Sequence, residues 1–66
     1  MISYEPLWET MKRKNITTYY LIYKQGFSPY TITMLKRNAS ITMHTLERLC
    51  KVLECTPNDI VKFTEE

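Results

Sequence analysis

Residues 17–38, TTYYLIYKQGFSPYTITMLKRN, hold the one glycine of this 66-residue chain. Thr17 is a favourable N-cap for a helix over about residues 18–25, which Leu21 would anchor in the core. Gly26 has no Cβ atom and can adopt the left-handed conformation that commonly ends a helix. The first half of this stretch therefore predicts a short helix that stops at a tight corner.

The second half predicts another helix directly after the corner. Ser28 is a favourable N-cap, and Pro29 suits the first helical position because no backbone N–H is missed there. Asn38 tolerates the left-handed conformation better than most residues and would close the helix at about Arg37. The corner holds this second helix rigidly against the first.

The two faces of the second helix differ in character. At 100° per residue, Ile32 and Leu35 point toward the same side as the cap. The opposite face carries Tyr30, Thr33, Met34 and Arg37. An exposed helix face normally shows Lys, Glu and Gln. This face has no carboxylate, which suits a groove with phosphates at its rim and base edges with thymine methyl groups at its floor.

The flanking segments predict three further helices. The first helix is predicted by an apolar stripe at helical spacing, which consists of Tyr4, Leu7, Trp8 and Met11. The fourth helix is predicted to begin after the N-cap Thr42. Its apolar stripe consists of Leu46, Leu49, Cys50 and Leu53. Residues 56–59, TPND, have the pattern of a capping box and predict a short fifth helix. Residues 2–4 and 61–64 have strand-like composition but are short enough to be frayed ends. We therefore expect an all-α, five-helix domain over residues 1–66, with short strand-like termini as the alternative at its ends.

Composition narrows the class of protein. The chain is 44% hydrophobic and 24% charged, which is typical of a globular domain, and 66 residues allow one core. No stretch is long enough to span a bilayer and Met1 is not followed by a signal peptide, so we expect a cytoplasmic protein. Cys50 and Cys55 have neither zinc-site nor redox-motif spacing and are interpreted as reduced packing residues. With His44 as its one histidine and no nucleophile and base pair, the chain is not expected to be an enzyme or to bind a metal or cofactor.

Charge is distributed unevenly along the chain. Residues 10–45 contain no Asp or Glu, but they do contain the basic residues Lys12, Arg13, Lys14, Lys24, Lys36 and Arg37. The acidic residues lie in residues 1–9 and 47–66. This asymmetry predicts a cationic face that can bind phosphates, although a solvated basic surface with no ligand is the simpler alternative.

The stretch from Thr18 to Asn38, with Gly26 at its corner, resembles the helix-turn-helix of the phage Cro and CI repressor type, the XRE-like family. Residues 41–60 resemble the fourth and fifth helices of that family, so the resemblance covers roughly residues 7–61. It extends to small stand-alone bacterial regulators. The chain departs from the family at Ile22, where many members have alanine, and at Gln25, where many have an aliphatic residue.

The resemblance implies a role for particular residues. Positions equivalent to Pro29, Tyr30 and Met34 approach bases in the family, and Thr31 and Thr33 are further candidates from their place on the same helix. The implied phosphate contacts are Thr17, Thr18, Ser28 and the loop of residues 37–40, with Arg37, Asn38 and Ser40 as its candidates. Lys36 and Arg37 are expected to hold phosphates because of their charge, although Arg37 can also reach a guanine.

Two functions remain open at this point. The first is sequence-specific binding of double-stranded DNA by a transcriptional regulator that places residues 29–37 in the major groove. The alternative is a protein-interaction module, such as an antitoxin or adaptor, whose contact patch consists of Tyr19, Tyr20 and Tyr23. No small-molecule effector is expected in either case.

A homodimer is also expected. One short recognition helix contacts too few base pairs to select a genomic site, and the resemblance implies two-fold dimers on near-palindromic operators. Candidate dimer contacts are Ile60, Val61 and Phe63, in the segment where acidic residues collect.

Overall fold

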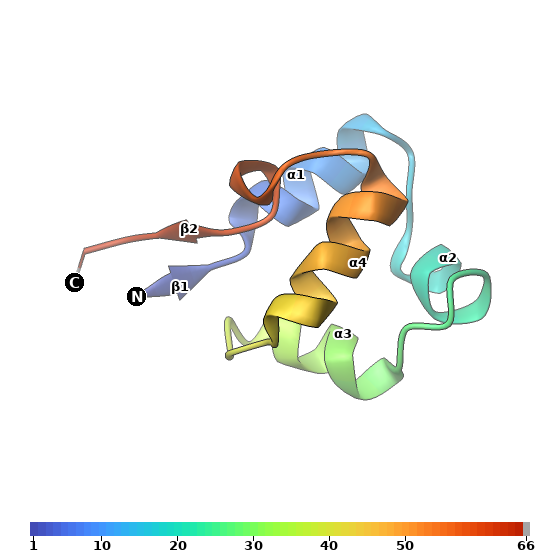
Figure 1. The fold of residues 1–66 in the computed structure, drawn as a ribbon, viewed down its shortest axis with the longest axis horizontal. Coiled ribbons are helices and arrows are strands. Elements are labelled where there is room, and N and C mark those ends of the chain that lie inside the picture. Colours follow the sequence, from blue (N-terminus) through green and yellow to red (C-terminus); the bar gives the residue numbers. More distant parts are fainter. Residues whose placement is uncertain (66) are drawn as a thin grey trace.

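The structure is a computed structural model that describes residues 1–65. Its elements, in chain order, are β1 (Ile2–Ser3), α1 (Glu5–Arg13), α2 (Thr18–Tyr23), α3 (Pro29–Lys36), α4 (Met43–Leu53), the 3₁₀ helix η1 (Pro57–Asp59) and β2 (Lys62–Phe63). In Figure 1, α4 runs through the middle of the molecule, with α3 at its N-terminal end and α1 near its C-terminal end. The fold is mostly helical, as predicted, with four α-helices and a small sheet among the described residues.

The prediction of a fifth α-helix is wrong. Thr56 and Asp59 do form the predicted capping box, but the helix that follows has three residues and is a 3₁₀ turn. The amide of Ile60 donates to the carbonyl of Pro57 over 3.0 Å, which closes this turn. The chain then becomes extended to form β2, so no residues remain for a further helical turn.

The ends of the chain form an antiparallel pair of strands instead of fraying. Ile2 pairs with Phe63 and Ser3 pairs with Lys62. Beyond the ladder, the amide of Thr64 donates to the carbonyl of Met1 over 2.7 Å. This pairing confirms the alternative of short strands at the ends of the domain. The sheet lies at one end of the longest molecular axis and α2 lies at the other (Figure 1).

Most residues of the predicted apolar stripes lie in the core, but Trp8 and Cys50 are only partly buried and pack against it. The buried apolar side chains are Tyr4, Leu7, Met11, Leu21, Phe27, Ile32, Leu35, Leu46, Leu49, Leu53 and Ile60. They come from all four α-helices and from residues beside them, so each α-helix is held by residues distant in sequence. Tyr4 lies just before α1 and not within it, and burial raises the pKa of its phenol. Its protonated hydroxyl donates to the carbonyl of Ala39 over 2.6 Å.

Three of the α-helices end in the same way. The amides of Ile16, Ala39 and Cys55 donate to the carbonyls of Met11, Met34 and Cys50, five residues earlier, over 2.9–3.0 Å. The residue before each donor, Asn15, Asn38 or Glu54, has a positive φ of 52–57°. This is the Schellman arrangement, which satisfies carbonyl groups at a helix end. The predicted role of Asn38 as the end of α3 is confirmed.

Candidate nucleic-acid interface

The corner between α2 and α3 is built as the sequence predicted. The hydroxyl of Thr17 accepts a hydrogen bond from the amide of Tyr20, and that of Ser28 accepts from the amide of Thr31, both over 3.1 Å. Gly26 has a φ of +77°. The helix α2 ends at Tyr23, two residues earlier than predicted. The caps and the glycine together fix the direction in which α3 leaves the corner.

Arg48 of α4 also holds this corner, and sequence reasoning missed it. Its guanidinium donates to the carbonyl of Gln25 over 3.0 Å and lies 4.2 Å from the centre of the Phe27 ring. The Phe27 ring is itself buried and its amide donates to the carbonyl of Leu21 over 2.9 Å. Arg48 therefore ties α4 to the segment that orients α3. In the sequence, Arg48 looks like any other basic residue on a helix, and no local pattern indicates its contacts with Gln25 and Phe27.

The outer face of α3 is exposed. Tyr30 has 70% of its surface accessible, and Pro29 and Thr33 are exposed as well. Met34 and Thr31 are half-buried. The inner face, with Ile32 and Leu35, is buried as predicted. The α3 helix therefore presents an aromatic ring and a thioether at a surface with no carboxylate of its own.

The two threonines of α3 already have hydrogen-bond partners. The hydroxyl of Thr33 donates to the carbonyl of Pro29 over 3.1 Å, and the hydroxyls of Thr31 and Ser28 lie 2.9 Å apart. Thr33 therefore retains only lone pairs for an external donor, such as an exocyclic amine of a base. These bonds restrict the contacts that the threonine hydroxyls of α3 can make with a ligand. Tyr30 is therefore the stronger candidate for a hydrogen-bond donor on this face.

The loop after α3 is tethered to the start of α1. The side-chain oxygen of Asn38 accepts from the amide of Tyr4 over 3.1 Å, and the hydroxyl of Tyr4 binds the next residue, Ala39. The side chains of Lys36, Arg37 and Ser40 are exposed around this tether. Asn38 thus has a second structural role, the tether to Tyr4, which the sequence did not predict.

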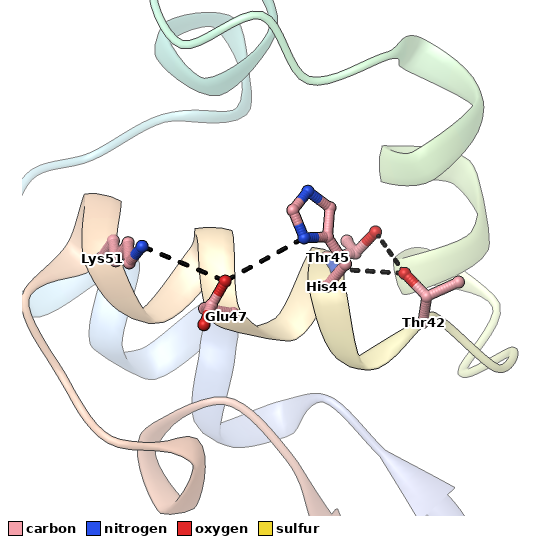
Figure 2. A network of polar contacts seen from close by, with 5 residues as sticks. All are labelled: Thr42, His44, Thr45, Glu47 and Lys51. Atoms are coloured by element: carbon pink, nitrogen blue, oxygen red, sulfur yellow. Dashed lines mark hydrogen bonds and ion pairs between the residues drawn. The ribbon is translucent and has the colours of Figure 1, made fainter.

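A groove of about 330 Å³ separates the exposed face of α3 from the start of α4. Its lining consists of Tyr30, Thr31, Met34, Ser40, Ile41, Thr42 and Thr45. Thr42 caps α4: its hydroxyl accepts from the amide of Thr45 over 3.1 Å and lies 3.0 Å from the hydroxyl of Thr45 (Figure 2). The predicted base-contact and phosphate-contact candidates Tyr30, Met34 and Ser40 therefore meet at one hollow surface.

Charged groups at α4 are partly neutralised. Glu47, the first acidic residue after the basic segment, lies 4.0 Å from both the imidazole of His44 and the ammonium of Lys51 (Figure 2). Lys14 does not join α3; its ammonium donates to the carbonyl of Glu54 at the far end of α4, over 3.3 Å. The basic residues of the segment are thus not all gathered at α3. Lys36 and Arg37 are the cations placed at its end.

Family comparison agrees with this architecture. The Cro/C1-type HTH DNA-binding domain matches residues 6–66. The chain belongs to the Cro/C1-type helix-turn-helix family.

A solved structure of similar fold is the crystal structure of the transcriptional regulator VanUg, with a TM-score of 0.89 and 26% sequence identity. The match covers 98% of this chain and 87% of that one. No curated protein gives a significant match. In this member of the Cro/C1-type family, Ile22 and Gln25 are both half-buried, and Ile22 packs against the core.

The candidate dimer contacts have different environments. Ile60 is in the core with 0% of its surface accessible, so its side chain cannot reach a second subunit in this fold. Phe63 is 82% accessible and Val61 is half-buried. Both line an apolar hollow of about 160 Å³, together with Ile2, Tyr4, Ser40, Ile41, Thr42, Met43 and Leu46.

Among residues 1–65, no helix has the length and apolar character needed to cross a membrane. Within the same residues, no group of three or more His, Cys, Asp and Glu side chains is placed to hold a metal ion.

Proposed function

We propose that this chain is a single-domain, cytoplasmic transcriptional regulator that binds specific double-stranded DNA sequences through α3. The observation that carries the proposal is the contrast between the two faces of α3. Ile32 and Leu35 fix the helix to the core, and the opposite face leaves Tyr30 exposed beside a groove. A helix held in this way can enter a major groove without disturbing its own domain.

Base recognition would centre on Tyr30 and Met34. The phenol of Tyr30 can donate to a base acceptor, whereas the thioether of Met34 offers an apolar contact that suits a thymine methyl group. Pro29 shapes the start of the helix without donating. Thr31 and Thr33 contribute as acceptors at the edges of this surface.

Phosphate contacts would surround α3. Candidate donors are side chains at the helix starts and in the loop after α3, namely Thr17, Thr18, Ser28, Lys36, Arg37, Asn38 and Ser40. Thr18 is half-buried and would donate through its hydroxyl. The side-chain oxygen of Asn38 already accepts from the amide of Tyr4, so Asn38 would donate through its side-chain N–H. Lys36 and Arg37 supply the charge that makes the binding salt-dependent.

A homodimer would give the required selectivity. Phe63 and Met43 are exposed apolar residues at the sheet and at the start of α4, and an apolar hollow lies between them. A second copy that covered this surface would bury Phe63 and Val61. Two copies related by a two-fold axis would present two α3 helices to two half-sites about one helical turn apart.

A second candidate function rests on the tyrosines of α2. The rings of Tyr19 and Tyr23 lie 4.6 Å apart, centre to centre, and both are exposed. An aromatic pair of this kind suits a protein partner, because aromatic residues are enriched at protein interfaces. Binding through this pair would depend little on salt.

Salt dependence distinguishes the two candidates. Duplexes selected from a random pool by the purified chain are titrated at several salt concentrations between roughly 50 and 200 mM. DNA binding through four to six phosphates per subunit predicts a log–log slope of about −0.9 per phosphate. A flat response, or no enrichment of any duplex, would contradict the proposal and favour the protein-interaction module.

A further inference from the structure

The C-terminal end of α4 places two cysteines side by side. The amide of Cys55 donates to the carbonyl of Cys50 over 3.0 Å, and Glu54 between them has a φ of 52°. This is the Schellman arrangement, in which the side chains of the residues joined by that bond commonly make an apolar contact. The backbone therefore holds Cys50 and Cys55 at positions whose side chains normally touch.

The same motif elsewhere in this chain does not carry two reactive side chains. At the end of α1 the corresponding residues are Met11 and Ile16, and at the end of α3 they are Met34 and Ala39. At the end of α4 both residues are free cysteines, and both are half-buried. The two thiols lie near enough that each affects the pKa of the other. The fold therefore brings the two cysteines together, although they are five positions apart in sequence.

The surroundings keep both thiols protonated. Burial raises the pKa of Cys50 and of Cys55, and the negative charge of Asp59 adds to the effect on each. The positive charge of Lys14 acts in the opposite direction and lowers the pKa of Cys55. Because the thiolate is the attacking species, thiol–disulfide exchange at this pair is slow at neutral pH, but its equilibrium depends on the proximity of the two sulfurs.

We propose that Cys50 and Cys55 form a modification site, a reversible intramolecular disulfide that closes on exchange with a low-molecular-weight disulfide such as oxidised glutathione. One cysteine, as thiolate, attacks a sulfur of glutathione disulfide, so that a mixed disulfide forms and one reduced glutathione leaves. The other cysteine then attacks the protein sulfur of the mixed disulfide, which forms the Cys50–Cys55 bond and releases a second reduced glutathione. The protein loses two thiol protons and two electrons, which the glutathione disulfide accepts.

The position of the Cys50–Cys55 bond in the fold determines what its closure would change. A Cys50–Cys55 bond would join the last turn of α4 to the segment that leads into η1, where Thr10 of α1 also binds the carbonyl of Asp59 over 2.8 Å. This junction is at the opposite end of α4 from α3 (Figure 1). Closure should therefore stabilise the native fold by restricting the unfolded chain, and should leave the surface of α3 unchanged.

The test equilibrates the full chain in glutathione redox buffers and quenches it by alkylation. Intact mass then gives the oxidised fraction, since closure removes two hydrogen atoms and leaves no glutathione attached. The equilibrium constant is measured once under native conditions and once in concentrated guanidinium chloride. We expect a constant at least about tenfold larger for the folded chain, and a melting temperature that rises on oxidation and returns on reduction.

For the wild-type chain, two results would overturn the proposal. One is an equal or smaller constant in the folded chain, since the native structure would then not favour closure. The other is accumulation of glutathione adducts or of disulfide-linked chains in place of the internal bond. The variant Cys55→Ser serves as the control and should form no internal bond, so its melting temperature should not respond to the redox buffer. A response of the same size in this variant would also contradict the proposal.

Discussion

Glu54 and Asn38 adopt the same left-handed backbone conformation but use their side chains differently. Glu54 is exposed at φ 52°, a conformation that costs a residue with a Cβ atom roughly 1 kcal/mol. We expect Glu54→Gly to stabilise the fold by about 0.5–1 kcal/mol, because glycine adopts this conformation without that cost. Chemical denaturation of the two proteins measures the difference.

Asn38→Gly is the matched control for that prediction. It relieves the same kind of backbone strain but removes the oxygen that accepts from the amide of Tyr4. A lost hydrogen bond of this kind costs about 0.5–1.5 kcal/mol, so the two effects should nearly cancel. If Asn38→Gly stabilises the fold as much as Glu54→Gly, the tether between Asn38 and Tyr4 contributes nothing.

Some individual residues could be predicted from the sequence and others could not. The caps Thr17 and Ser28 act on residues within one helical turn, so a local pattern is enough to identify them. Arg48 and Asn38 act on residues more than twenty positions away. Contacts of that kind depend on how helices meet, which no local pattern records.

Among the elements, η1 is joined to α1 by a part-buried hydrogen bond. Thr10 is buried, and its hydroxyl donates to the carbonyl of Asp59 over 2.8 Å. Thr10→Val keeps the shape of the side chain but leaves that carbonyl without its partner. We expect a loss of about 1–3 kcal/mol in the free energy of unfolding. Thr33→Val, which removes a hydroxyl from an exposed position on α3, should change it by less than about 0.5 kcal/mol.

Equal losses in these two variants would show that the bond from Thr10 to Asp59 does not stabilise the junction of α1 and η1. Thermal or chemical unfolding of both variants, measured side by side, gives the comparison. The α3 variant also reports whether its local hydroxyl bond to Pro29 matters for the helix.

The helices α1 and α4 were predictable as elements because each has an apolar stripe that recurs at helical spacing over about two turns. The short length of η1 could not be predicted. A capping box such as that of Thr56 and Asp59 indicates where a helix starts but not how long it is. Its end is set by β2, which pairs with residues sixty positions away. The same pairing explains why the ends of the chain are strands.

The two exposed aromatic surfaces of the molecule lie at opposite ends of its longest axis. The sheet, with the exposed Phe63, lies at one end and the tyrosines of α2 lie at the other (Figure 1). If the sheet end is the dimer surface, Phe63→Lys should shift the protein toward monomer in sedimentation equilibrium at micromolar concentration. The expected cause is an unpaired charge placed in an apolar contact.

Tyr23→Lys is the control, since Tyr23 is 69% accessible and lies at the opposite end of the molecule. It should leave the association unchanged. A wild-type chain that sediments as a monomer, and binds DNA one copy at a time without cooperativity, would exclude the dimer and leave a weaker DNA-binding domain.

Base recognition by α3 is tested by a ratio of two affinities, one for a selected duplex and one for a scrambled duplex. The purified chain is titrated with its selected duplex and with a scrambled duplex of the same composition, beside the variants Tyr30→Ala and Tyr23→Ala, whose tyrosines are almost equally exposed. We predict that Tyr30→Ala lowers the ratio about 5- to 150-fold, as loss of one base contact would, with little change in melting temperature. Tyr23→Ala should keep the wild-type ratio. A ratio near one for the wild type, or a ratio unchanged by Tyr30→Ala, would contradict the account.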